Sequence, residues 1–198
     1  MKKTIALFDF DGTITFLDST QSFYRYLYKS RLSFFVNHYI FCLWYLVLYR
    51  INIKSYLKLK DKRLDIHTSK YNEAEFFNLT EDFYKKFFIS LLNPKAIERI
   101  RWHKNHGHDI WVISASYDFL LQKWTDQNSI SLITNKTTMI NSKRVMLGKD
   151  VNYEVKLEYL RQQVNLEEYS EIYAYGDSDG DKAMLSIANF KFYKPFRN

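Results

Sequence analysis

The stretch IALFDFDGTIT (residues 5–15) places two aspartates, Asp9 and Asp11, at the end of an apolar run. Residues 3–9 have the pattern of a strand that is buried on both faces of a parallel sheet. A buried carboxylate is costly unless a partner compensates its charge. The stretch therefore predicts a parallel α/β sheet and, at the end of its first strand, a site in which something pairs with both acids.

Further along the chain, strand patterns alternate with helix patterns. We expect a helix from residue 94 to about 106, a strand at 109–116, a helix at 117–126 capped by Ser116, and a strand with a hairpin over 131–148. A helix at 153–164 and strands at 171–176 and 189–193 follow. This alternation predicts a Rossmann-like parallel sheet.

Residues 18–92 have helical patterns throughout and interrupt the alternation after the first strand. We therefore expect a core domain of residues 1–15 and 94–198 and an inserted helical cap domain of residues 16–93. The length of 198 residues suits one domain with such an insertion.

Cys42 is the only cysteine, so no intramolecular disulfide can form, and this fits a reducing compartment. The start MKKTIALF resembles a secretion signal, but Asp9 ends its apolar run after four residues, and we reject that interpretation. We expect a cytoplasmic protein, with a peripheral position at the inner membrane face as the alternative.

The net charge of +7 is concentrated in residues 50–63, which carry a local surplus of five positive charges. Four of these basic residues recur every four positions: Arg50, Lys54, Lys58 and Lys62. Residues 34–49, just before them, are almost wholly apolar but fall short of the about 20 residues that span a bilayer. The pattern fits either a buried helix with a solvated basic face or, less commonly, an interfacial helix on an anionic membrane. No recognition motif accompanies the charge, so we expect no nucleic-acid partner.

Polar residues follow three of the predicted strands, and the carboxyl ends of parallel strands meet at one edge of a sheet. Up to four carboxylates would gather there, with one lysine, which cannot balance them. A divalent, oxygen-preferring cation can, and Mg²⁺ is the usual choice when a phosphate is the other ligand. The residues concerned are Asp9, Asp11, Ser114, Lys156, Asp177 and Asp181.

Asp9 and Asp11 are two residues apart at a strand end, where both can point to the same side. One can act as a nucleophile held ionised by a metal. The other can be a general acid with a pKa raised by the nearby negative charge. Gly12 allows a tight exit from the strand, and the backbone N–H groups of this turn can hold phosphate oxygens. Taken alone, the same residues would also fit an ordinary turn.

The motifs DFDGT (residues 9–13), VISAS (112–116), Lys156 and GDSDGD (176–181) resemble, in order, the four motifs of haloacid dehalogenase-like hydrolases. The resemblance covers the whole chain. It implies that Asp9 is the nucleophile and a metal ligand, and that Asp11 is the general acid and base, with its backbone carbonyl on the metal. It also implies metal roles for Asp177 and Asp181. The phosphoryl group would be held by Ser114, Lys156, Phe10, Gly12, Thr13 and Ala115.

The helical insertion after the first motif resembles the cap of the phosphoserine phosphatase-like subfamily IB, including bacterial phosphatidylglycerophosphate phosphatases. Asp18 aligns with an acidic cap residue that contacts the substrate amine in phosphoserine phosphatases, although it would equally suit a helix cap. Dehalogenases of the family lack the second acid, so Asp11 argues against dehalogenation.

The resemblance thus implies a Mg²⁺-dependent phosphatase that hydrolyses a small phosphate monoester through an aspartyl-phosphate. A lipid-phosphate phosphatase at the membrane surface, a phosphomutase and a non-catalytic membrane-surface or partner-binding module are the alternatives. The oligomeric state stays open.

Overall fold

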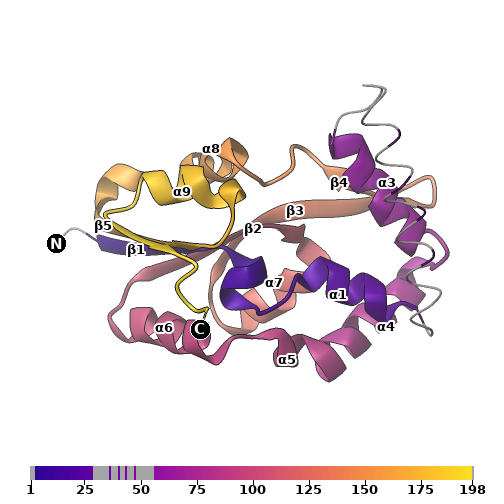
Figure 1. Ribbon diagram of the computed structural model, residues 1–198, viewed down its shortest axis with the longest axis horizontal. Helices are drawn as coiled ribbons and strands as arrows, with labels where there is room; N and C mark the ends of the chain where they lie inside the picture. Colours follow the sequence, from indigo (N-terminus) through magenta and orange to yellow (C-terminus); the bar gives the residue numbers. More distant parts are fainter. Residues whose placement is uncertain are drawn as a thin grey trace.

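The sheet of this protein has six strands in the order β4-β3-β2-β1-β5-β6 (Figure 1). The computed structural model describes residues 3–28 and 56–197 and, between them, Val36, Ile40, Leu43 and Val47. The parallel strands are β1 (Lys3–Phe8), β2 (Asp109–Tyr117), β3 (Ser131–Ile140), β5 (Tyr169–Gly176) and β6 (Phe190–Tyr193). The edge strand β4 (Lys143–Leu147) runs antiparallel to β3. The predicted α/β class and the predicted hairpin are therefore confirmed.

Strand β1 lies in the middle of the sheet, with β2 on one side and β5 on the other. Its residues alternate between the two faces. Ala6 and Phe8 belong to one buried cluster, and Ile5 and Leu7 belong to the other. A strand with a core on each face needs apolar residues at every position, which explains the continuous run before Asp9.

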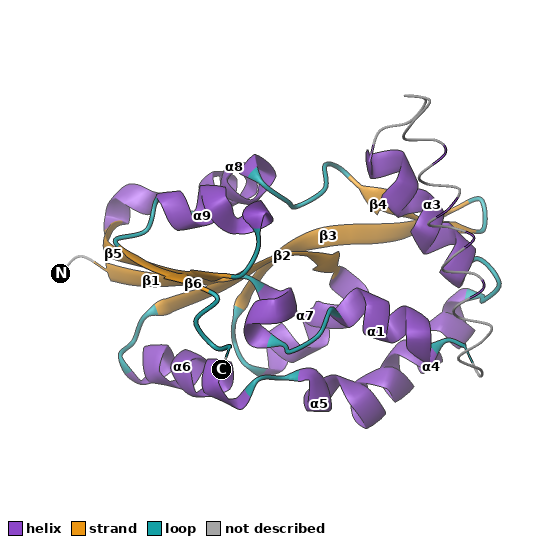
Figure 2. Cartoon of the chain, in the orientation of Figure 1, coloured by secondary structure: helices purple, strands orange, loops and turns teal. Residues whose placement is uncertain are grey.

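Helices cover both faces of the sheet (Figure 2). On one face lie α6 (Pro94–Asn105) and α7 (Asp118–Gln127), and on the other α8 (Glu154–Gln163) and α9 (Lys182–Ser186). Helix α6 begins as predicted, with Pro94 in its first turn and the Asn93 side chain accepting a hydrogen bond from the Lys95 N–H (3.0 Å).

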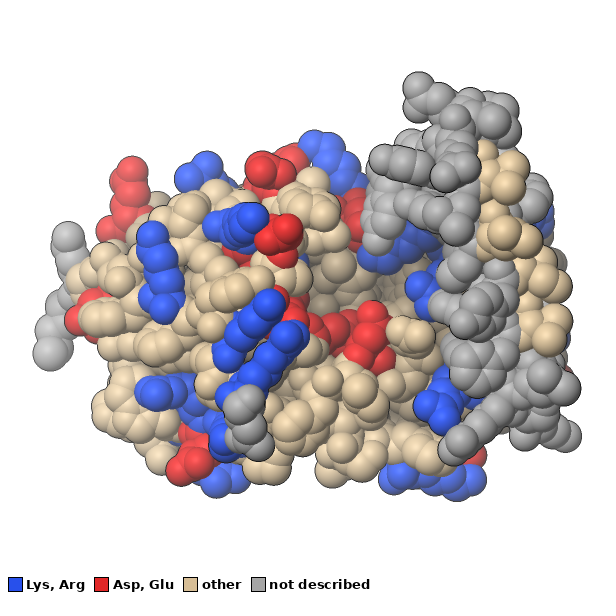
Figure 3. Space-filling view, in the orientation of Figure 1, with Lys and Arg blue, Asp and Glu red and all other residues tan. Residues whose placement is uncertain are grey.

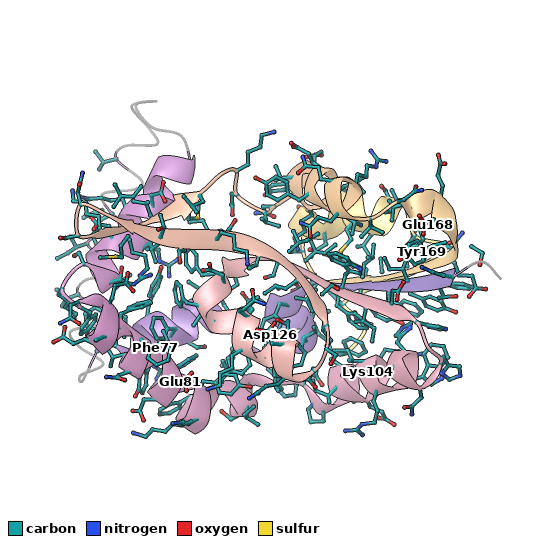
Figure 4. The ribbon with its side chains drawn as sticks, turned by 180° about the vertical axis from the view of Figure 1, so that it is seen from behind. Phe77, Glu81, Lys104, Asp126, Glu168 and Tyr169 are labelled. Carbon is teal, nitrogen blue, oxygen red and sulfur yellow. The ribbon has the colours of Figure 1, made fainter. Side chains whose placement is uncertain are left out.

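The helical insertion (our name for residues 16–93) contributes α1 (Ser19–Tyr26), α3 (Tyr56–Thr68), α4 (Glu73–Phe83) and α5 (Ile89–Leu91). Aromatic rings fill the space between these helices and α7; the ring of Phe23, for example, lies 5.8 Å from that of Phe76 and 5.6 Å from that of Phe119. Seen from behind, Glu81 lies on α4 next to α7, and Lys123 of α7 donates to its carboxylate at 2.5 Å (Figure 4). The division into a core domain and a cap domain stays a prediction.

Two details of the sequence-based prediction are wrong. Ser116 does not cap α7, because β2 extends through Tyr117 and the helix begins at Asp118 without a side-chain cap. The Ser116 hydroxyl instead pairs with the Ser19 and Thr20 hydroxyls of α1, each at 2.9 Å. The described part of residues 18–92 is also not helical throughout, since it turns before α4 and becomes extended at Leu92.

The predicted apolar helix over residues 34–49 lies largely outside the described residues, as do Arg50, Lys54 and the side chain of Lys58. Four of its positions are described, and all four are helical. Their side chains are exposed: Val36 by 49%, Ile40 by 62%, Leu43 by 66% and Val47 by 52%. Within the described part of the chain, no helix is both long enough and apolar enough to cross a membrane.

Candidate active site

A cavity of about 700 Å³ opens beyond the carboxyl ends of β1, β2 and β5. Figure 3 shows acidic side chains beside a hollow in the middle of this face. Both the loops that follow the strands and the helical insertion line the cavity, so that a ligand would contact both. This is the edge at which ligands bind in open α/β sheets.

Three carboxylates meet where these strands end, and two of them, Asp9 and Asp177, line the cavity. Asp9 follows β1, Asp177 follows β5, and Asp181 precedes α9; one oxygen of each lies within 4.8 Å of the others. Asp181 is fixed because its Oδ2 accepts hydrogen bonds from the backbone N–H of Asp177 (3.1 Å) and from the N–H and hydroxyl of Ser178 (2.9 and 2.8 Å). The predicted convergence of strand ends is thus what the structure shows for these residues.

Lys156 lies between two of these acids and is only 2% exposed. Its Nζ donates to Asp9 Oδ1 at 2.5 Å and to Asp181 Oδ1 at 2.6 Å. Burial alone would lower the pKa of this lysine, but the two carboxylates reverse the effect and raise it. Lys156 is therefore a cation, and it is shared between two acids rather than assigned to one.

The acids that remain undercompensated have raised pKa values. Burial raises the pKa of Asp9 to about 7, because Lys156 offsets only part of the cost of burying the charge. Burial also raises the pKa of Asp177. For Asp181 burial acts in the same direction, but Lys156 and the hydrogen bonds from Ser178 outweigh it and lower the pKa. A cluster of oxygen donors with such excess negative charge fits a hard divalent cation such as Mg²⁺.

Asp11 stands apart from this cluster. Its Oδ1 accepts a hydrogen bond from the Ser19 N–H (2.7 Å), at the start of α1. Burial, and then the nearby carboxylate of Asp18, raise the pKa of Asp11 well above its usual range. This carboxyl group therefore takes up a proton more readily than an ordinary aspartate.

Gly12 separates Asp11 from the rest of the turn and has a φ of +78°, a conformation that favours glycine. A Cβ at this position would lie 2.5 Å from Asp177 Oδ2, closer than real atoms approach. Gly12 therefore lets the turn after β1 pack directly against the Asp177 carboxylate at the end of β5.

The other predicted phosphate-binding residues divide into two groups. Ser114 and Ala115 line the cavity at the end of β2, and the Ser114 Oγ accepts a hydrogen bond from the Ser116 N–H (3.1 Å). Phe10 and Thr13 are buried and do not line it; the ring of Phe10 packs against Trp124, 5.5 Å away. The structure therefore does not bring these two residues to the cavity wall.

Asp18 lines the cavity from the helical insertion, and its carboxylate also accepts a hydrogen bond from the Gln21 N–H (2.6 Å). Asp18 therefore caps α1, which is the helix-cap interpretation of the sequence analysis. Its exposed position leaves the second carboxylate oxygen open to the cavity.

Several cavity residues were missed by sequence reasoning. They are Tyr24, Lys60, Arg63, Tyr117, Asn152, Ser178 and Arg197. Lys60 and Arg63 are three residues apart on α3 and share a helix face, which could have been read from their spacing. Arg197 pairs with Asp177 Oδ2, and no motif signals that contact, since it depends on how the segment after β6 folds back.

Comparisons with known proteins agree with this geometry. The family model of haloacid dehalogenase-like hydrolases matches residues 6–186. Protein CicA of Caulobacter vibrioides (strain NA1000 / CB15N) is 29% identical over 196 residues, which are 98% of this chain and 86% of that protein. A Bordetella pertussis Tohama I protein of unknown function has the same fold, with a TM-score of 0.78, 18% identity and coverage of 95% of this chain and 88% of that chain.

A phosphoserine phosphatase, solved as a phospho-aspartyl intermediate analogue, also shares the fold. Its TM-score is 0.69 at 19% identity, over 96% of this chain and 86% of that chain. A phosphoserine phosphohydrolase-like protein of Francisella tularensis subsp. tularensis SCHU S4 gives a TM-score of 0.64 at 20% identity, over 98% and 86% of the two chains. With the family match spanning nearly the whole sheet and all four motifs, this chain belongs to the haloacid dehalogenase-like hydrolases.

Proposed function

We propose that this protein is a Mg²⁺-dependent phosphatase that hydrolyses a small phosphate monoester, with the helical insertion acting as its cap domain. One observation carries the proposal. Asp9 lies within the buried cluster of Lys156, Asp177 and Asp181, whereas the second acid, Asp11, lies outside it with a raised pKa. A nucleophile beside a cation site and a separate proton carrier are the two parts that phosphate-ester hydrolysis needs.

In the proposed reaction, a carboxylate oxygen of Asp9 attacks phosphorus and forms an aspartyl-phosphate, while the bond to the leaving oxygen breaks. Asp11 gives its proton to that oxygen, so the alcohol leaves neutral. Asp11, now ionised, then takes a proton from water, and the water oxygen attacks phosphorus. This step releases inorganic phosphate and restores the Asp9 carboxylate and the protonated Asp11.

The remaining residues hold the groups in place. Lys156 and Ser114 bind phosphoryl oxygens, and the 2.5 Å contact of Lys156 with Asp9 opposes the rise that burial causes in the Asp9 pKa. Asp9, Asp177 and Asp181, with the backbone carbonyl of Asp11, would hold Mg²⁺, which when bound neutralises phosphoryl charge.

The charges of the cavity support a dianionic ligand. With Asp11 counted as protonated, as the proposed reaction requires, the acids counted as charged at the site, Asp9, Asp18, Asp177 and Asp181, equal in number the basic side chains Lys60, Arg63, Lys156 and Arg197. A divalent cation adds two positive charges, and a phosphate monoester at neutral pH brings about two negative ones. The loaded site would therefore be close to neutral.

The direct test is a phosphatase screen with Mg²⁺, using p-nitrophenyl phosphate, phosphoserine and a panel of other phosphate esters. We expect phosphate release that is lost in Asp9→Asn and kept in Asp179→Asn, a control on an exposed acid of the same motif set. A purified, folded protein that releases no phosphate from any ester would contradict the proposal. Isotopic oxygen from water in the released phosphate separates hydrolysis from the phosphomutase alternative.

A second candidate, a lipid-phosphate phosphatase at an anionic membrane surface, has one observation in its favour. Val36, Ile40, Leu43 and Val47 are spaced by four, three and four residues, which places them on one side of a helix, and all are exposed. The basic residues 50–63 follow this apolar stripe.

The test is flotation with anionic vesicles at low salt, together with activity on phosphatidylglycerophosphate in mixed micelles. We expect binding that Leu43→Ser and Ile40→Ser weaken and that Phe77→Ser, on an exposed apolar residue of α4, does not. An absence of vesicle binding by the unsubstituted protein would remove this candidate.

A further inference from the structure

Lys60 reaches from the helical insertion into the sheet domain. It lies on α3, and its Nζ donates to the Ala115 carbonyl at 2.7 Å and to Asp150 Oδ1 at 2.5 Å. The side chain is 15% exposed, so the ammonium has little access to water. A buried ammonium group is unfavourable unless hydrogen-bond acceptors surround it.

The acceptors form a socket that residues of the sheet hold together. Asn135 Nδ2 donates to the same two atoms, the Ala115 carbonyl and Asp150 Oδ1, each at 2.7 Å. Asn135 Oδ1 accepts the Val151 N–H at 2.8 Å, which ties the socket to the loop after β4. Lys60 therefore completes an arrangement whose other members come from the strands and their loops.

The socket borders the phosphoryl end of the cavity. Ala115 directly follows Ser114, and Lys60 itself lines the cavity. The next residue, Ser116, is also held by the helical insertion, through the hydroxyls of Ser19 and Thr20. The insertion thus contacts two consecutive residues near the carboxyl end of β2, directly after the serine that is proposed to hold phosphate.

Electrostatics agrees with a docking role. Burial lowers the pKa of Lys60, and the attraction of Asp150 opposes this without cancelling it. Asp150 is itself buried, and its second oxygen, Oδ2, has no hydrogen-bond partner within the described residues. Burying the Lys60 ammonium or the Asp150 carboxylate without the other would therefore lower the stability of the fold.

We propose that Lys60 is a positioning residue: by docking in the socket of Ala115, Asn135 and Asp150 it holds the helical insertion closed over the phosphoryl-binding end of β2. The inference rests on the proposed phosphatase function for its kinetic consequences, but the docking itself can be measured without turnover. If the closed, binding-competent state is populated less often, the apparent affinity for substrate falls by the same factor. A complex that does form still reacts at the same rate.

The experiment compares Lys60→Met, Asp150→Asn and the double variant with the unsubstituted protein. Lys62→Met is the matched control, because Lys62 lies two residues away on the same helix and is exposed. Steady-state kinetics with p-nitrophenyl phosphate and Mg²⁺ give KM and kcat, inhibition by inorganic phosphate gives affinity, and hydrogen exchange of residues 61–68 reports docking of α3.

We expect each single variant to raise KM and the inhibition constant for phosphate about tenfold and to change kcat by less than about twofold. The double variant should resemble the single variants, since both remove the same contact. Exchange of residues 61–68 should quicken in all three and stay unchanged in Lys62→Met.

Three results would overturn the inference. If Lys60→Met raises KM and Asp150→Asn does not, Lys60 contacts substrate directly. If the effects of the two variants multiply, they act separately. If exchange of residues 61–68 does not change, Lys60 does not dock the helix. A protein without phosphatase activity would defeat the proposed function, but the exchange measurement would still test the docking.

Discussion

Replacing Lys156 with methionine tests whether the buried acids depend on this one cation. Methionine has a similar length and removes the charge. Lys156 is 2% exposed and lies 2.5 Å from Asp9 and 2.6 Å from Asp181, so the variant leaves two buried carboxylates without their shared partner. Asp177, in the same cluster, adds to the repulsion.

Removing one partner of a buried ion pair typically costs about 3–5 kcal/mol of unfolding free energy. We expect a loss in this range when a chelator is present at neutral pH. The loss should shrink as the pH falls, because protonation of Asp9, whose pKa is already raised to about 7, removes part of the uncompensated charge. A divalent cation that binds only the folded state at about 100 times its dissociation constant adds about 2.7 kcal/mol. Mg²⁺ at that level should therefore stabilise the variant by a similar amount relative to the same variant in chelator.

The assay is urea unfolding followed by tryptophan fluorescence, with a chelator and with excess MgCl₂. Lys149→Met is the matched control, because Lys149 pairs with Glu158 on the surface, and we expect no measurable change for it. A loss below about 1 kcal/mol for Lys156→Met in chelator, or an unfolding free energy of the variant that Mg²⁺ does not raise, would refute the reasoning.

Two further predictions concern a glycine and a histidine. Gly12→Ala should lower kcat/KM about 100-fold, since the new Cβ would displace Asp177. Gly107, the control position, also has a positive φ, but a Cβ there would meet nothing within 4 Å. Gly107→Ala should therefore cost about 1–2 kcal/mol of stability without changing activity. His103 is buried, and burial lowers its pKa to about 3 from a usual value of 6.5. Because the unfolded chain takes up this proton first, the unfolding free energy should fall as the pH drops from about 6.5 towards 3. Urea unfolding at several pH values checks this, and His103→Gln should flatten the dependence, whereas His106→Gln, on an exposed residue, should not.

The sequence predicted most reliably the positions of those site residues that lie at or directly after the end of a strand. Asp9 and Asp177 follow strands that are recognisable from apolar runs, and parallel strands bring their carboxyl ends to one edge whatever lies between them. The same argument placed Ser114 correctly at the end of β2. Such positions follow from the topology alone, which is why the α/β class and the clustering of the carboxylates were predictable together.

Contacts between the helical insertion and the sheet were not predictable in this way. The orientation of α3 depends on tertiary packing against the β3–β4 hairpin, where Asp61 Oδ1 accepts the Met146 N–H at 2.8 Å. Only that orientation turns Lys60 and Arg63 towards the cavity, while Lys62, between them, is exposed. A charge run in a sequence does not say which of its members will face inward.

The place of β1 in the sheet has a consequence for how the chain folds. Strand β1, which leads into the proposed nucleophile Asp9, is made before its partners β2 and β5, whose nearest residues lie about a hundred positions later and more. Pairing over such separations is slow, because the chain loses the entropy of closing a long loop before the strand contacts form and stabilise it. Until then Ile5–Phe8 is an unpaired apolar segment of the kind that promotes aggregation. We therefore expect a need for chaperone protection on the ribosome that lasts until β5 has emerged.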